Sequence, residues 1–136
     1  MSIKEREREI VDEFALFPEW MDKYEYLIEL GRSLPAIEEK DKTDENLIKG
    51  CQSRVWVKCD VKDGKLWFTA DSDAIITKGI ISLLIKVYNG ETPKDILAAP
   101  PEFIKEIGLQ ENLSPTRANG LAAMIERIKA YAISFN

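Results

Sequence analysis

SRVWVKCDVKDGKLWFTA, residues 53–70, is the segment of the chain with the clearest structural pattern. Apolar residues alternate with polar ones on each side of Asp63-Gly64, which is the period of a half-buried strand. The Asp-Gly pair is a strong signal for a two-residue hairpin turn, because both positions of such a turn need a positive φ. We therefore expect an antiparallel hairpin, with a first strand over about 53–61 and a return strand that includes residues 66–70.

Two helical patterns precede the hairpin. Ser2 and Glu5 form a capping box at the start of the first helix, which we expect to end at Phe17. The second helix should stop at Gly31, because a glycine directly after a helix takes the left-handed conformation at low cost. The charged segment 38–42 that follows predicts a solvated connector.

After the hairpin, residues 74–88 are apolar nearly all round and predict a central buried helix. Gly79 lies inside it and costs about 1 kcal/mol relative to alanine, so we expect close packing against another element there. The last helix should begin with Ser114 as its N-cap. These patterns predict an α+β fold, with a small antiparallel β-sheet packed against helices in one domain over residues 1–136.

Charge and hydropathy narrow the classes of partner. The chain has 136 residues and a formal net charge of −5, and its lysines and arginines are not clustered. Nucleic acids and anionic membranes attract basic surfaces, so we expect neither as a main partner. We find no signal-peptide pattern and no apolar run of about 20 residues that would span a membrane, which predicts a cytoplasmic protein.

The chain contains no histidine and only two cysteines. A Ser-His or Cys-His nucleophile pair is therefore excluded within one chain. An iron–sulfur cluster takes about four thiolates, so two separated cysteines do not hold one, and we expect no metal and no cofactor on this chain. Because a strand separates Cys51 from Cys59, an internal disulfide is excluded as well, and both thiols should be free.

The segment Gly-Cys-Gln-Ser at residues 50–53 is where we expect the chemistry. Gly50 permits a positive φ, and Gln52 and Ser53 are polar, so the pattern predicts a turn that presents the Cys51 thiol. A thiolate attacks a sulfane sulfur directly, so a relay of sulfur through a persulfide needs no general base. That chemistry suits a chain without histidine.

Other residues are candidates for supporting Cys51. Arg117 falls at the third position of the last helix, where the helix dipole disfavours a cation, so it is the candidate cation for a thiolate. Asp73 is most simply a cap of the buried helix, and the alternative is that it holds the cysteine loop or contacts a partner. Gly120 predicts a close approach by another element. Cys59 shares a strand face with two valines and is expected to fill the core.

Five segments resemble motifs of the SufE family of cysteine desulfuration proteins, the sulfur acceptors of iron–sulfur cluster assembly. They are residues 23–35 (KYEYLIELGRSLP), 50–56 (GCQSRVW), 71–79 (DSDAIITKG), 93–97 (PKDIL) and 113–121 (LSPTRANGL). The resemblance covers nearly the whole chain. It implies a fold similar to that of SufE and of the IscU-type scaffold proteins, with Cys51 at the position of the family's acceptor cysteine.

The resemblance implies that Cys51 takes a persulfide from a pyridoxal-phosphate-dependent cysteine desulfurase and stimulates that enzyme. The sulfur would then pass to an iron–sulfur cluster scaffold complex, and pyridoxal phosphate would lie on the partner enzyme. Family members hold the acceptor loop against an apolar pocket until the desulfurase draws it out. Asp73 and Arg117 lie in motifs close to that loop.

Two other functions compete with sulfur transfer. One is a protein-binding module that activates a desulfurase without carrying sulfur, while Cys51 only packs its loop. The other, a thiol-dependent hydrolase, is disfavoured because no base is available to activate the thiol. The sequence leaves open whether the chain counts as an enzyme, which desulfurase it serves, and whether it forms a homodimer.

Overall fold

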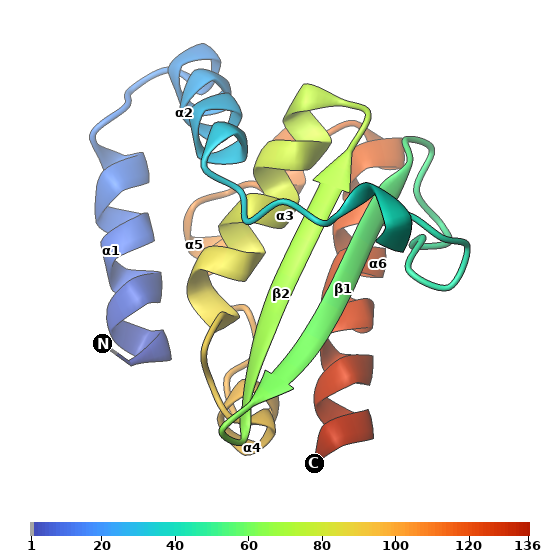
Figure 1. Cartoon of the computed structure of the whole chain (residues 1–136). Coiled ribbons are helices and arrows are strands. Elements are labelled where there is room, and N and C mark those ends of the chain that lie inside the picture. The colour runs from blue at the N-terminus through green and yellow to red at the C-terminus, as the bar shows by residue number, and fades with distance from the viewer. Residues whose placement is uncertain (1) are drawn as a thin grey trace.

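A two-stranded hairpin forms the sheet in the computed structural model, which describes residues 2–136 (Figure 1). Strands β1 (Val55–Lys62) and β2 (Lys65–Ser72) pair antiparallel, with Val55 opposite Ser72. Asp63 and Gly64 connect them with φ values of 55° and 74°, the left-handed values that a type I′ turn requires. The predicted hairpin is confirmed, and its first strand begins at Val55 rather than at Ser53.

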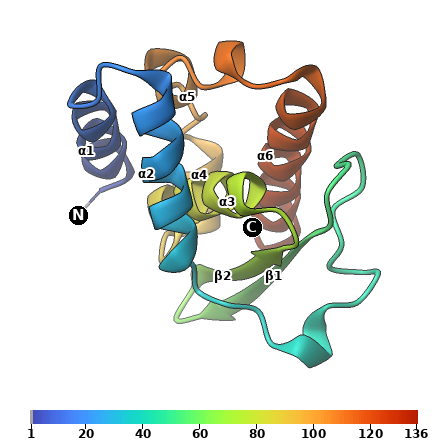
Figure 2. The same ribbon diagram turned by 90° about the horizontal axis from the view of Figure 1, so that it is seen from above.

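One face of the hairpin forms a wall of the hydrophobic core. Its buried side chains are Val55, Val57, Leu66, Phe68 and Ala70. Helix α3 (Ile75–Tyr88) packs against β2 and is buried on most of its sides, as its sequence predicted. In Figure 2 the labelled helices lie on this side of the hairpin. The architecture is therefore the expected α+β arrangement, with a small antiparallel sheet covered by helices.

Helix α1 (Ile3–Ala15) begins at the predicted capping box and is followed by α2 (Trp20–Arg32). The expectation that α2 stops at Gly31 is wrong, because Gly31 lies inside its last turn and is buried against α3. A Cβ on Gly31 would lie 3.2 Å from Gly79 N, and a Cβ on Gly79 would lie only 2.2 Å from Leu27 O. Both glycines therefore serve the close contact between α2 and α3.

Residues 33–54 connect α2 to β1 and cross in front of both strands in Figure 1. Ala36 pairs with Ala70 along the outer edge of β2, and Leu47 pairs with Trp56 along the outer edge of β1. The connector therefore borders the hairpin on both edges before it reaches the first strand.

The charged part of this connector is exposed over residues 38–40, as expected, and is docked on the sheet at Lys42. It contains the short 3-10 helix η1 (Glu39–Asp41), followed by Lys42. Lys42 Nζ lies 2.7 Å from Asp71 Oδ2 and 5.3 Å from the centre of the Trp56 ring, and only 18% of its side chain is exposed. The connector thus covers part of the polar face of the hairpin.

After α3 the chain forms three short helical elements and one long helix. The short elements are α4 (Pro93–Leu97), α5 (Phe103–Glu106) and the 3-10 helix η2 (Gln110–Asn112). Helix α6 (Pro115–Phe135) begins with the predicted N-cap Ser114, whose Oγ accepts a hydrogen bond from Arg117 N. It packs against α3 and α4. Throughout residues 2–136, the structure has no helix that combines the length and the apolar character needed to cross a membrane.

Candidate functional site

Cys51 lies in a short loop, residues 49–54, directly before β1; we call it the cysteine loop. The two ends of this loop are joined, because Ile48 N donates a hydrogen bond of 2.8 Å to Val55 O. Gly50 has a φ of 92°, in the left-handed region that glycine adopts without strain. The cysteine loop therefore reverses the chain direction, and a backbone hydrogen bond closes it at its two ends.

The cysteine loop packs against one face of helix α6. Cys51 Sγ lies 3.7 Å from Gly120 O, a distance at which the thiol donates a weak hydrogen bond. A Cβ on Gly120 would lie 3.4 Å from Cys51 Sγ, and a Cβ on Gly50 would lie 3.6 Å from Ala123 Cβ. The close approach that the sequence predicted at Gly120 is thus made by the cysteine.

A hollow of about 340 Å³ lies beside the thiol, between the cysteine loop and the N-terminal parts of α3 and α6. Of the candidate residues from the sequence, those that line this hollow are Cys51, Gln52, Ser53, Arg117 and Gly120. Gly50 precedes them in the same loop, whereas Asp73 does not line the hollow.

The exposed Thr116 of this hollow was missed in the sequence, and so were three further residues: Thr77, Ile80 and Met124. Each lies on a helix where its spacing is that of a core residue, and all three are indeed buried. Thr77 offered the only local signal, since a hydroxyl within an otherwise apolar helix is unusual. Its position beside the thiol depends on how α3 packs against the loop, which no local pattern reports.

Burial controls the ionisation of Cys51. The residue is half-buried and packed against the core, and this burial raises the pKa of its thiol. The neutral thiol therefore predominates at neutral pH in this conformation. Arg117, the expected cation, lines the same hollow but is exposed, and the pKa of Cys51 remains above its ordinary value beside it. The loop thus holds a protected thiol.

Asp73 joins the end of the cysteine loop to the start of α3. Its Oδ1 accepts a hydrogen bond of 3.0 Å from Arg54 N, and its own N donates one of 3.2 Å to Arg54 O. The N-cap of α3 is Ala74, which provides no side-chain cap, so the simplest expectation, that Asp73 caps this helix, is wrong. Its carboxylate binds the backbone of the loop instead.

Cys59 occupies a different environment. It lies in β1 opposite Phe68 and packs against the core. Burial, with a further contribution from the Asp60 carboxylate, raises the pKa of its thiol to about 12. Both cysteines are free, as expected, and Cys59 is partly buried and packs against the core rather than filling it.

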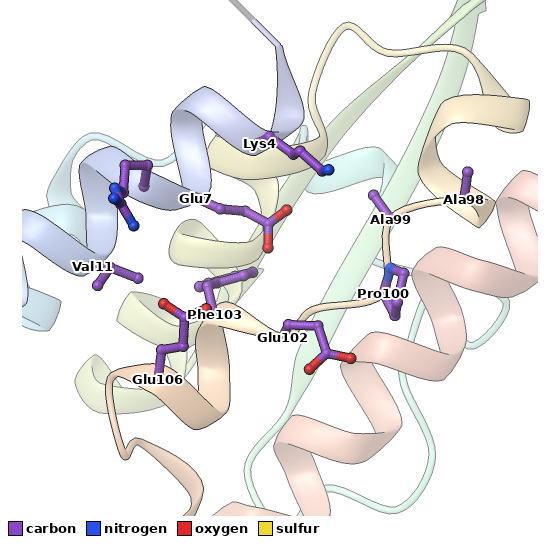
Figure 3. Close-up of a pocket in the computed structure, with 10 residues that line it drawn as sticks. Lys4, Glu7, Val11, Ala98, Ala99, Pro100, Glu102, Phe103 and Glu106 are labelled. Carbon is purple, nitrogen blue, oxygen red and sulfur yellow. The ribbon is translucent and has the colours of Figure 1, made fainter.

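A larger hollow, of about 440 Å³, lies between α1 and the segment that leads from α4 into α5 (Figure 3). Glu7, Glu102 and Glu106 border it, and burial together with the two neighbouring carboxylates raises the pKa of Glu7. Residues 2–136 nevertheless contain no group of three side chains arranged to hold a metal ion. The lining of this hollow includes no thiol, whereas Cys51 lines the smaller hollow.

Comparison with known proteins gives concordant matches. The sequence model of the SufE family, described as an Fe-S metabolism associated domain, matches residues 8–132. An uncharacterized SufE-like protein of Rhizobium meliloti is 40% identical over 129 residues, which cover 91% of this chain and 92% of the relative. An uncharacterized SufE-like protein of Synechocystis is 38% identical over 126 residues, which cover 93% of this chain and 79% of the relative.

A solved structure has a similar fold. The solution structure of a hypothetical protein from Thermus thermophilus matches with a TM-score of 0.78 and 25% sequence identity. The match covers 95% of this chain and 94% of that chain. The sequence matches and the structural match therefore each cover nearly the whole chain.

Proposed function

The chain belongs to the SufE family, which is associated with iron–sulfur metabolism, and from this we propose that Cys51 carries sulfur as a persulfide. The donor is the persulfide on the active-site cysteine of a cysteine desulfurase, which supplies the pyridoxal phosphate. The recipient is an iron–sulfur cluster scaffold complex. The observation that carries the proposal is the Cys51 thiol itself, free and half-buried in a short loop beside a hollow, in a chain without histidine.

The transfer replaces one sulfur–sulfur bond by another. The Cys51 thiolate attacks the terminal sulfur of the donor persulfide, and the new bond to Cys51 Sγ forms as the donor's own S–S bond breaks. The donor cysteine leaves as a thiolate and takes up a proton, while the Cys51 thiol has given one up. The exchange therefore needs no external oxidant and no base from this chain.

Cys51 must leave Gly120 to meet a donor on another protein. Its contact with α6 consists of one weak sulfur hydrogen bond and van der Waals packing. Movement into solvent removes the burial that raises the pKa of the thiol, so extension of the loop exposes and activates the nucleophile together. Return of the loop protects the loaded sulfur from other thiols.

The hollow beside Cys51 suits the returning persulfide. Its volume of about 340 Å³ leaves room for the additional sulfur atom. Ser114 and Arg117 border it at the first turn of α6, where the positive end of the helix dipole favours an anion. In this proposal Arg117 acts after the transfer, when its positive charge lies near the persulfide anion on Cys51.

Intact mass measurement tests the proposal. After incubation with a cysteine desulfurase and cysteine, the wild type and Cys59→Ser should each gain one sulfur atom, and Cys51→Ser should gain none. Cys59→Ser is a matched control, because it removes the other free thiol of the chain. Equal labelling of Cys51→Ser would refute the assignment.

A second function, activation of a desulfurase without sulfur transfer, is favoured by the burial of Cys51 and its raised pKa, which are also properties of a structural cysteine. In that case Cys51→Ala stimulates the desulfurase as fully as the wild type does. Sulfur transfer predicts that this variant loses stimulation, because the donor persulfide is no longer discharged.

A further inference from the structure

Helix α6 contacts the cysteine loop and both of its flanking segments along one stripe. Gly120 contacts Cys51 and Ala123 lies next to Gly50, both within the loop. Arg127 and Tyr131 follow at intervals of four residues, so they lie on the same side of the helix. We call Arg127 and Tyr131 the α6 clamp, because they bind the segments on which the loop stands.

Arg127 holds the segment that enters the loop. Its Nη1 donates a hydrogen bond of 3.1 Å to Glu45 O, and its Nη2 donates one of 2.9 Å to Leu47 O. The two carbonyls are two residues apart, at the end of a turn, and the planar fork of one guanidinium reaches both. Lysine has a single nitrogen and lacks this fixed fork.

Tyr131 holds the segment that leaves the loop. Its hydroxyl donates a hydrogen bond of 2.8 Å to Val57 O, within β1. The guanidinium carbon of Arg127 lies 5.9 Å from the centre of the Tyr131 ring, so the two clamp residues also support each other. The flanks are in addition paired directly, since Val57 N donates to Asn46 O at 2.9 Å.

The loop between these flanks is attached more weakly. Cys51 is held by a sulfur hydrogen bond of 3.7 Å and by packing on Gly120, and Arg54 is held by Asp73. Sulfur is a poor hydrogen-bond partner, whereas hydrogen bonds from a charged guanidinium are among the strong ones. The loop has one charge-assisted hydrogen bond, from Arg54 N to Asp73, whereas its flanks have two from Arg127 in addition to that of Tyr131. Opening of the loop therefore costs less than release of its flanks.

We propose that Arg127, supported by Tyr131, is a positioning residue for sulfur transfer, which keeps the flanks on α6 while residues 49–54 alone swing outward. The positioning role rests on the proposed function, whereas the attachment of the flanks to α6 by Arg127 and Tyr131 does not. With Ile48 fixed, Cys51 lies three residues along the chain, so extended backbone carries it at most about 10 Å from its base. The partner must therefore present its persulfide within about that distance of the start of β1.

Three measurements on the full chain in a Cys59→Ser background test the clamp. Arg127→Ala should speed hydrogen exchange of Ile48 N and Val57 N about tenfold, which corresponds to about 1.4 kcal/mol of local opening. Alkylation of Cys51 by iodoacetamide should rise about threefold or more, because a small reagent needs an exposed thiol and no positioning. Single-turnover sulfur transfer at saturating desulfurase should instead fall about tenfold, with the half-saturating concentration unchanged.

Matched variants separate positioning from a loss of stability. Arg32→Ala removes an exposed arginine that pairs with Glu29, and it should leave all three measurements unchanged. Tyr131→Phe keeps the ring and removes only the hydroxyl, so it should also speed exchange and alkylation and slow sulfur transfer, but by smaller factors. This variant provides the test if Arg127→Ala fails to fold. Arg127→Lys should not restore slow exchange, because it lacks the fork.

The outcomes are distinguishable. Unchanged exchange and alkylation in both Arg127→Ala and Tyr131→Phe would overturn the clamp. Faster sulfur transfer in these variants would overturn the positioning role, since release of the flanks would then assist extension. If exchange and alkylation rise as expected but the wild type accepts no sulfur, the clamp stands and the proposed function fails.

Discussion

Cys51 lies against Gly120, with its Sγ 3.7 Å from the carbonyl oxygen of the glycine and 3.4 Å from the point where a Cβ would stand. Apart from the chain neighbours Asn119 and Leu121, no other described residue places a side chain within 4 Å of that point. The space above Gly120 is thus filled by the thiol. The size of the side chain at position 120 should control how well the cysteine is held.

Substitution of Gly120 should separate helix stability from thiol protection. Gly120→Ala places a methyl group in ordinary contact with the sulfur and should stabilise α6 by about 0.5–1 kcal/mol, with alkylation of Cys51 little changed. Gly120→Val adds methyl groups that collide with the sulfur and should speed alkylation severalfold. Thermal unfolding and alkylation kinetics check both variants, and equal alkylation in all three proteins would contradict the prediction.

Removal of the Asp73 carboxylate should loosen the loop without unfolding the protein. Asp73→Ala deletes the acceptor of Arg54 N, a hydrogen bond to a charged group worth about 1.5 kcal/mol or less at this exposed position. We expect alkylation of Cys51 to rise severalfold. Ser72→Ala, which removes the neighbouring acceptor of Ala74 N, is the control for disturbance of the start of α3 and should leave alkylation unchanged.

The raised pKa of Cys51 has a measurable consequence. The rate of alkylation of the wild type should increase with pH to a midpoint above the ordinary pKa of a cysteine thiol, and Asp73→Ala should lower this midpoint. Because folding raises the pKa, the stabilising effect of the neutral thiol is complete below the ordinary value and is lost as pH rises above it. Wild type should therefore lose more stability in alkaline solution than Cys51→Ser does.

Glu7 should make the fold slightly less stable at neutral pH. Burial, and then the carboxylates of Glu106 and Glu102, raise the pKa of Glu7, so the stability that it contributes is present in acid and lost as pH rises through that raised pKa. Glu7→Gln should raise the stability at neutral pH by about 0.5 kcal/mol or less, because the group is partly solvated. The gain should vanish in acid, and the exposed Glu126→Gln should show none.

The elements that the sequence predicted correctly have local signals. Asp63 and Gly64 define their turn by themselves, and Ser114 caps the helix that directly follows it. Gly31 was misinterpreted because a glycine near the end of a helix looks the same whether it ends the helix or lets another backbone approach. Its partner, Gly79, lies on a different helix, and only the folded chain reveals the contact.

The residues of the candidate site also differ in whether their own sequence neighbourhood reveals their role. Cys51 was predictable from its own neighbours, and Gly120 from its cost within a helix. Arg127 was not, because the carbonyls that it binds belong to Glu45 and Leu47, some 80 residues away in the chain. A charged residue on an amphipathic helix ordinarily faces solvent, so nothing in its local pattern indicates a contact with the backbone of a distant loop.

The isolated bridges along the edges of β1 and β2 limit how other proteins can pair with the hairpin. A two-stranded sheet ordinarily offers two unpaired edges to strand addition and aggregation. Here Leu47 occupies one edge, Ala36 and Glu91 occupy the other, and the uncovered end of β1 carries the charged residues Lys58, Asp60 and Lys62. The proposed sulfur transfer requires repeated docking and release, and the covered edges leave a docking protein little free strand backbone with which to form a lasting sheet.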